Sequence, residues 1–178
     1  LSWQLRIATQ FGVAAACVYF IPNLRLTAFI DQPWFTGLLS VLWIVALINS
    51  FNMLDNMDGL SAGIATIAAG FLAAVMVLAP DPETRGPQLF VAGFLLVLAG
   101  SLVGFLWHNR PPAKIFMGDA GSYFVGFNIA VATLLASYTK FGGENRHAIL
   151  APLLVMAVPL YDLITVLAIR VKNGRSIF

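Results

Sequence analysis

Six apolar runs, each close to the length of a membrane crossing, restrict what this chain can fold into. About 20 residues at 1.5 Å rise per residue are enough to cross ~30 Å of hydrocarbon. Backbone polar groups in lipid must find their partners within the segment, so these runs are predicted to be helices. The sequence therefore predicts an all-α, polytopic bundle of transmembrane helices that forms one integral-membrane domain over residues 1–178. The runs cover roughly 5–21, 35–48, 59–79, 89–107, 122–138 and 148–169, and the short second run needs its polar end at the membrane interface.

The composition is typical of a protein in lipid, and the charge argues against a nucleic-acid partner. Hydrophobic residues make up 60% of the chain and charged residues 10%, whereas soluble domains carry roughly 25% charged residues. A soluble core of this size cannot hide that much apolar surface. The formal net charge is only +2 and the basic residues are scattered, so we expect no nucleic-acid partner. The single cysteine, Cys17, cannot form an intrachain disulfide.

The first polar stretch, residues 49–60, lies at the boundary between the second and third apolar runs. Carboxylates and carboxamides at the edge of hydrocarbon are costly to desolvate, so they are typical of places that bind a metal, a polar ligand or one another. In a structural alternative, Asp58 caps the helix that follows, while Asn49 and Asn52 form interhelical hydrogen bonds. That alternative explains two or three of the five polar side chains, which are Asn49, Asn52, Asp55, Asn56 and Asp58.

The second polar stretch, residues 108–122, precedes the fifth apolar run. Gly118 and Gly121 flank Asp119, and glycine allows a backbone to approach a ligand closely. The free N–H groups and the positive dipole end of the following helix favour an anion at this point. A hard cation would join Asp119 to that anion, because Mg²⁺ takes one or two carboxylates together with phosphate oxygens and water. The structural alternative is that Asp119 only N-caps the helix.

The predicted topology brings both polar stretches to one side of the membrane. With six crossings, six Lys and Arg residues lie on the side of the polar stretches and four lie on the other side. The positive-inside rule then assigns the side of the polar stretches to the cytoplasm. The six are Arg6, Arg110, Lys114, Arg170, Lys172 and Arg175, and the four are Arg25, Arg85, Lys140 and Arg146.

Together the two stretches resemble the motifs of a known family. Asn-x-x-Asn-x-x-Asp-x-x-Asp-Gly-Leu at residues 49–60 is followed, one helix pair later, by Pro-Ala-Lys-Ile-Phe-Met-Gly-Asp-Ala-Gly-Ser at residues 112–122. This order is similar to that of the polyprenyl-phosphate N-acetylhexosamine-1-phosphate transferases of glycosyltransferase family 4. The resemblance is closer to the enzymes that use N-acetylglucosamine than to the phospho-N-acetylmuramoyl-pentapeptide transferases. It implies a fold of about ten helices, of which about six are present here.

The resemblance also implies a reaction and its setting. The family transfers an N-acetylhexosamine-1-phosphate, here N-acetylglucosamine-1-phosphate, from a UDP-sugar to undecaprenyl or another polyprenyl phosphate and releases UMP. Mg²⁺, or Mn²⁺ in its place, is the implied cofactor. The implied setting is a bacterial plasma membrane with the active site on the cytoplasmic face, a homodimeric assembly, and a role in cell-wall or surface-polysaccharide synthesis.

Roles for single side chains follow from the resemblance as well. Asp119 would bind the metal ion, Asn52 would reach the same ion or the diphosphate, and Asp55 would complete the catalytic group. Phe116 would stack on the uracil ring, and Asp58 would hydrogen-bond its edge. The other substrate contacts would be Asn109 at the nucleotide, Asn49 in the polar cleft and Lys114 at phosphate.

Two expected family features do not occur in these 178 residues: an adjacent pair of aspartates before the run at 5–21 and a histidine-rich loop after residues 174–176. We therefore expect an internal fragment, incomplete at both ends, that has no activity in isolation. Asn56 stands where the family often has glycine, which leaves the local backbone geometry open.

Two other classes of protein remain as alternatives. Asp55-x-x-Asp58-Gly59 resembles part of the CDP-alcohol phosphotransferase pattern, but that pattern continues with Ala-Arg and further aspartates, and here Ala62 is followed by Gly63. A transporter or channel would use the polar helix ends as an ion or solute path. Asp162, close to Pro159 in the last run, is the best candidate for such a path. The favoured interpretation of Asp162 is a structural partner for a neighbouring polar group.

Overall fold

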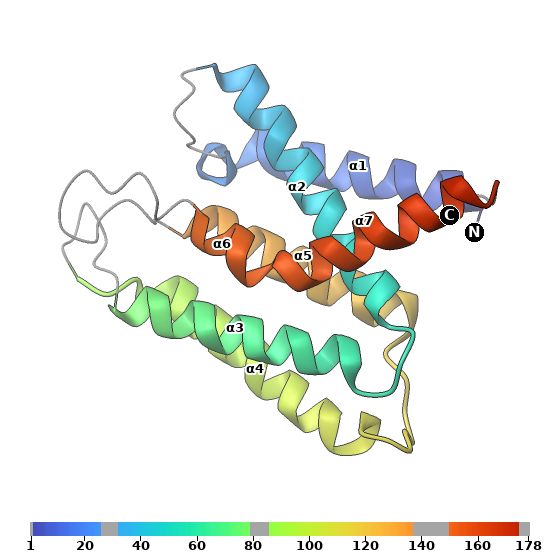
Figure 1. Cartoon of the computed structure of the whole chain (residues 1–178). Helices are drawn as coiled ribbons and strands as arrows, with labels where there is room; N and C mark the ends of the chain where they lie inside the picture. The colour runs from blue at the N-terminus through green and yellow to red at the C-terminus, as the bar shows by residue number, and fades with distance from the viewer. Residues whose placement is uncertain (1, 26–31, 79–85, 137–149, 175–178) are drawn as a thin grey trace.

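The computed structural model describes residues 2–25, 32–78, 86–136 and 150–174, and the secondary-structure elements in these ranges are helices (Figure 1). Three of them, α2, α3 and α4, are long and apolar enough to cross a membrane. The protein is therefore a multi-pass membrane helix bundle, as predicted, while six crossings stay a prediction. The elements are α1 (Trp3–Phe20), the short 3₁₀ turn η1 (Pro22–Leu24), α2 (Pro33–Leu54), α3 (Leu60–Leu78), α4 (Leu89–Asn109), α5 (Gly118–Leu135), α6 (Leu150–Val155) and α7 (Ala157–Lys172).

Helix α2 is the central element, because α1, α5 and α7 all pack against it. The contact with α5 is very close at Gly126, where an added Cβ would lie 2.7 Å from the backbone Cα of Ile48. Small residues let helices in lipid approach each other in this way. Trp43 crosses the same interface and donates a hydrogen bond from Nε1 to Thr133 Oγ1 at 2.9 Å.

Helices α3 and α4 form a second tight pair beside this group (Figure 1). Ala65, Ala69 and Ala73 follow one another at helical spacing on α3 and are buried, so the alanine face permits close packing against α4. Large apolar side chains point outward instead: Ile67 on α3 is 74% exposed and Phe90 on α4 is 79% exposed. A surface of this kind suits contact with lipid chains.

Two helix boundaries differ from the predicted ones, and both differences move site residues into helices. Helix α2 continues to Leu54 instead of ending near residue 48, so Asn49 and Asn52 are helical. Helix α5 begins at Gly118 instead of near residue 122, with Met117 at the N-cap position. Asp119 therefore lies in the first turn of α5, and the structural alternative in which it is the N-cap is wrong.

The last predicted run is not one helix but two, which are separated at Met156. Proline lacks a backbone N–H and its ring crowds the carbonyl four residues earlier. Pro159 on α7 thus leaves the carbonyl of Val155 without a helical donor, and α6 ends at Val155.

Candidate active site

Side chains from three helices meet around Asp119. Its Oδ2 accepts a hydrogen bond from Arg6 Nη1 on α1 at 2.7 Å, which is also an ion pair. Its Oδ1 accepts from Asn52 Nδ2 on α2 at 3.1 Å, and the same Nδ2 lies 3.0 Å from Ser122 Oγ. The carboxylate stays accessible, because the side chain of Asp119 is 59% exposed. We call these four residues the Asp119 cluster. The structure thus brings Asp119 and Asn52 into contact, while their shared role at a metal ion stays a prediction.

A second group of polar contacts joins the loop after α2 to the loop after α4. Asp58 Oδ2 accepts a hydrogen bond from the backbone N–H of Ala113 at 2.9 Å. Asn109 Oδ1 accepts from the N–H of Gly59 at 3.0 Å, and its Nδ2 donates to the carbonyl of Ile115 at 2.9 Å. Gly59 itself has a φ of +74°, a backbone conformation that favours glycine. We call Asp58, Asn109 and these backbone partners the loop brace.

The loop brace bears on two of the predicted nucleotide contacts. Asn109 is 4% exposed, and both ends of its amide bind backbone groups. Asp58 is exposed, and its contact with Ala113 ties it to the loop after α4. Direct contact of either residue with a nucleotide stays a prediction. Each already has a clear structural task in holding the two loops together.

Asn49 lies deeper, on the face of α2 that meets α1. It is 6% exposed, and its Nδ2 donates to Gln10 Oε1 at 2.7 Å and to the carbonyl of Val45 at 2.8 Å. The interhelical hydrogen bond expected in the structural alternative is thus present. Gln10 is buried as well, and its Nε2 has no hydrogen-bond partner among the described residues.

Asp55 follows the last residue of α2 and is half-buried beside the Asp119 cluster. Burial raises the pKa of its carboxyl above the ordinary 3.8, and the negative charge of Asp119 raises that pKa further. A hydrogen bond with the backbone of Gly118 acts in the opposite direction and lowers the pKa. The two carboxylates are therefore close enough to repel each other, a situation that a cation between them would relieve.

Phe116 and Lys114 lie on the loop between α4 and α5. The Phe116 side chain is 76% exposed, so its ring is available to a ligand. The side chain of Lys114, together with Arg110 and His108, lines a cavity of about 460 Å³ beside Trp107. Arg110 lies over the Trp107 ring at 4.8 Å from its centroid. Phe116 lines neither this cavity nor a second one, which Arg6 and Asn52 line, so neither of these two cavities gathers all the predicted residues.

Comparison with known families decides where the chain belongs. Residues 1–137 match the model of glycosyl transferase family 4, and they include both polar stretches. The chain belongs to glycosyl transferase family 4.

Curated relatives of this family 4 member are bacterial enzymes. A probable undecaprenyl-phosphate N-acetylglucosaminyl 1-phosphate transferase of Bacillus subtilis is 34% identical over 99% of this chain and 48% of its own length. A decaprenyl-phosphate N-acetylglucosaminephosphotransferase of Mycobacterium leprae is 37% identical over 97% of this chain and 45% of its own. A phospho-N-acetylmuramoyl-pentapeptide-transferase of Limosilactobacillus fermentum is 43% identical over 75% and 40%. The chain thus spans about half the length, or less, of these relatives.

The polar side chains around Asp119 fit a divalent metal ion that takes only one or two of its ligands from the protein. In the described ranges, no three His, Cys, Asp or Glu side chains gather as a metal cage. Mg²⁺ suits such a site, since it binds one or two carboxylates and completes its shell with phosphate oxygens and water. Asp119, with Asp55 beside it, supplies that number of carboxylates.

Three residues of the site were not predicted from the sequence: Arg6, Gln10 and Ser122. Arg6 was counted only among the residues of the positive-inside rule, although it binds Asp119. Ser122 belongs to the second motif and is buried against Asn52. Gln10 gave a usable signal, because a polar residue inside an apolar run is costly and is typical of a buried contact or a functional site.

Proposed function

We propose that the protein containing this chain transfers N-acetylglucosamine-1-phosphate from a UDP-sugar to a polyprenyl phosphate, at the cytoplasmic face of a bacterial plasma membrane. The observation that carries the proposal is the meeting of Asp119, Asn52 and Arg6 from three helices at one end of the bundle. Family membership supports the reaction class. Relatives named for N-acetylglucosamine cover 97–99% of the chain, which supports that sugar over N-acetylmuramoyl-pentapeptide.

In the proposed reaction, an oxygen of the acceptor phosphate attacks the β-phosphorus of the UDP-sugar. The new O–P bond forms while the bond from that phosphorus to the bridging oxygen breaks, and UMP leaves. Such phosphoryl transfers depend mainly on positioning and charge neutralisation. Arg6 supplies a positive charge beside the Asp119 carboxylate. Asn52, bonded to both Asp119 and Ser122, keeps that carboxylate oriented.

Mg²⁺ or Mn²⁺ would be held by Asp119 and Asp55, and it would neutralise charge on the diphosphate. The amide nitrogen of Asn52 faces Asp119, so its oxygen would ligate the same ion only after the amide turns. Asn52 therefore acts first as a positioning residue. The raised pKa of Asp55 fits a carboxylate that gains from a nearby cation.

The nucleotide would lie on the side of the cluster formed by the loop after α4. The exposed Phe116 ring would stack on uracil, and Asp58 would reach the base edge with the carboxylate that also binds Ala113. Asn109 would act through the loop brace, by fixing the loop that carries Phe116. Lys114 supplies positive charge on the same loop.

One observation favours the second candidate function, an ion or solute path. The helix break at Met156 lies six residues before Asp162, whose Oδ2 is inaccessible to solvent and has no hydrogen-bond partner among the described residues. Discontinuous helices and membrane carboxylates are features of transporters. The polar residues at the helix ends favour the transferase, because they converge on one carboxylate instead of following a path across the bundle.

The test follows the phosphorus atom. The full-length protein in nanodiscs is given UDP-N-acetylglucosamine labelled with ³²P at the β-position, undecaprenyl phosphate and Mg²⁺. We expect the label to enter the lipid fraction while unlabelled UMP is released. Label left in water-soluble UDP would instead mean transfer of the sugar alone, which contradicts the proposal.

Two controls sharpen this experiment. The purified 178-residue chain should transfer no label, because the aspartate pair and histidine-rich loop that the family resemblance implies do not occur in it. Asp162→Asn in the full-length protein should retain transfer. If the variant transfers normally but the parent also carries ions across liposomes in an Asp162-dependent way, the second function is present beside the first.

A further inference from the structure

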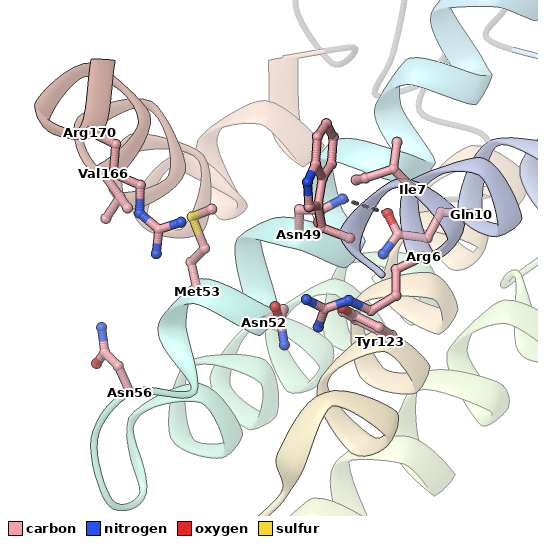
Figure 2. Close-up of a pocket in the computed structure, with 11 residues that line it drawn as sticks. Arg6, Ile7, Gln10, Asn49, Asn52, Met53, Asn56, Tyr123, Val166 and Arg170 are labelled. Atoms are coloured by element: carbon pink, nitrogen blue, oxygen red, sulfur yellow. Dashed lines mark hydrogen bonds between the residues drawn. The ribbon is translucent and has the colours of Figure 1, made fainter. Parts of the chain in front are cut away.

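The cavity of about 460 Å³ at the end of α4 lies apart from the Asp119 cluster. None of its lining residues belongs to that cluster, and none lines the cavity of about 330 Å³ that Figure 2 shows beside Arg6. Its walls come from the last turn of α4 and from the loop that follows. The lining residues are Trp107, His108, Arg110, Pro111, Pro112 and Lys114.

Helix α4 connects this cavity to a surface that suits lipid chains. The helix packs mainly against α3 (Figure 1), and it is one of the three helices that are long and apolar enough to cross a membrane. Val97, Val103 and Trp107 are exposed along it. Tryptophan is typical of the membrane–water interface. Because Trp107 also lines the cavity, the cavity lies at the level of the lipid headgroups.

The charge of the cavity favours an anion. Arg110 and Lys114 both line it, and none of its lining residues is acidic. Within the described ranges, neither of these two cations forms an ion pair, whereas Arg6 is paired with Asp119. Arginine and lysine bind phosphate oxygens through charge-assisted hydrogen bonds. A phosphate could therefore bind here without first breaking an ion pair of the described residues.

The walls of the cavity are held in place by contacts within the loop. The Arg110 guanidinium lies over the Trp107 ring, 4.8 Å from its centroid, and its N–H donors remain available to a ligand. The backbone N–H of Lys114 donates to the carbonyl of His108 at 2.8 Å. Asp58 binds the next backbone N–H, that of Ala113, from outside the cavity. A site that is already shaped loses little conformational freedom when it binds a ligand.

The same residues select against a zwitterionic headgroup. A choline or ethanolamine cation would need a carboxylate or an open aromatic face. The cavity has no carboxylate, and Arg110 already covers one face of Trp107. An anionic glycerophospholipid brings a phosphate without such a cation. Since a water molecule occupies ~30 Å³ in the liquid, the cavity has room for that phosphate and the glycerol next to it.

We infer that this cavity binds the headgroup phosphate of an anionic phospholipid from the surrounding bilayer. Arg110 and Lys114 hold the phosphate oxygens, and His108 contributes a further hydrogen-bonding group. Trp107 lies beside the glycerol, and the acyl chains follow the exposed apolar side of α4 into the membrane. Binding here needs neither a UDP-sugar nor a polyprenyl phosphate.

Competition between two lipids tests the site. The full-length protein in detergent is given equal amounts of phosphatidylglycerol and phosphatidylcholine with identical acyl chains, without UDP-sugar, and native mass spectrometry counts the lipids bound. Arg110→Gln and Lys114→Gln each remove one positive charge from the cavity. Lys172→Gln is the matched control, because it removes the same charge at an exposed position of α7 outside the cavity.

We expect the parent to prefer phosphatidylglycerol, and each cavity variant to weaken its binding about fivefold, the scale for one Lys or Arg beside an anionic lipid surface. Phosphatidylcholine binding should not change, and Lys172→Gln should bind both lipids as the parent does. Thermal unfolding verifies that the variants are folded.

Three outcomes would overturn the inference. The first is parent-like phosphatidylglycerol binding in both cavity variants. The second is an equal loss in Lys172→Gln, which would mean that overall charge attracts the lipid. The third is displacement of phosphatidylglycerol by equimolar soluble glycerol phosphate, which would make the ligand a free phosphate.

The lipid competition and the ³²P transfer experiment can fail independently. A protein that transfers label but binds phosphatidylglycerol equally well with and without Arg110 and Lys114 would lack only the lipid site. A protein that loses phosphatidylglycerol in both cavity variants but transfers no label would lack only the proposed reaction.

Discussion

The Asp119 cluster and the loop brace lie at the same end of the bundle, yet they use polar groups differently. In the cluster, side chains bind side chains, and the central ion pair is partly open to solvent. In the loop brace, side chains bind backbone N–H and C=O groups, and Asn109 is buried. Partners of the first kind can be exchanged for a ligand without unfolding a loop, whereas partners of the second kind cannot. The residues that we assign to the reaction and the residues that hold the loops in place are therefore different, although some of them are only a few positions apart in sequence.

The largest effect is expected at the centre of the cluster. Asp119→Asn in the full-length protein should lower kcat by roughly 10²–10³, the scale for losing one preorganised charge-stabilising group. The melting temperature should hardly change, because exposed ion pairs contribute about 0–1 kcal/mol. Label transfer and thermal unfolding measure the two quantities. A variant with the parent rate would remove Asp119 from the chemistry and weaken the contrast with the loop brace.

The opposite pattern is expected in the loop brace. Asn109→Ala leaves the N–H of Gly59 and the carbonyl of Ile115 without their partner, so unfolding should become easier by ~1–3 kcal/mol. Asn128→Ala is the matched control, because the amide of Asn128 binds a carbonyl of its own helix, that of Phe124. Chemical denaturation in detergent gives the comparison. Lost UMP binding at parent stability would instead make Asn109 a direct substrate contact, as the family resemblance implies.

Phe116 lies in sequence between Ile115, whose carbonyl belongs to the loop brace, and Asp119. Its substitution tests whether the ring binds the nucleotide or supports the loop. Phe116→Ala should weaken UMP binding by ~1–3 kcal/mol, the value of one base–aromatic stack. Stability should be kept, since the ring is 76% exposed. Ile115→Ala, a change in the neighbouring side chain, is the control. Equal UMP affinities in the parent and Phe116→Ala would remove the ring from the nucleotide site.

The smallest effect concerns Asp55 and depends on pH. Because its folded-state pKa is raised above 3.8, the folded protein binds this proton more tightly than the unfolded chain does. Stability from this group therefore falls as pH rises from about 3.8 through the folded-state pKa. Asp55→Asn should lack that fall and be at least as stable as the parent at neutral pH. Melting temperatures across the acidic range measure this, and identical pH profiles would contradict the burial of Asp55.

Much of the helical fold could be predicted from the sequence, because apolar runs in lipid have few alternatives to helix. The apolar run predicted an end of α2 near residue 48, because the polar residues Asn49 and Ser50 follow it. In the structure both bind carbonyls four residues earlier, at 2.8 Å, so they remain within the helix. The division at Met156 was missed, although Pro159 was visible and carries the physical reason for it.

The candidate site was predictable in its central pair and not in its surroundings. Asn52 and Asp119 stood out as costly polar groups at helix ends, and they meet. The partners of Asp58 and Gln10 are 55 and 39 residues away in sequence. No local pattern specifies such distant contacts. The structural alternative made Asp58 a helix cap, and in the structure its carboxylate binds the backbone of the loop after α4.

The contact at Gly126 has a consequence for how such an enzyme can change. One turn beyond Ile48 on α2 lies Asn52, and one turn before Gly126 on α5 lies Ser122, so the missing side chain sets the gap across which Asn52 and Ser122 meet. Because Gly126 has no side chain, α2 and α5 approach closely enough for Asn52 and Ser122 to form their hydrogen bond one turn away. Substitutions that suit a thicker or thinner bilayer by shifting α2 against α5 would also shift Asn52 relative to Asp119. Adaptation to a new membrane and retention of the polar cluster are therefore coupled through a single backbone contact.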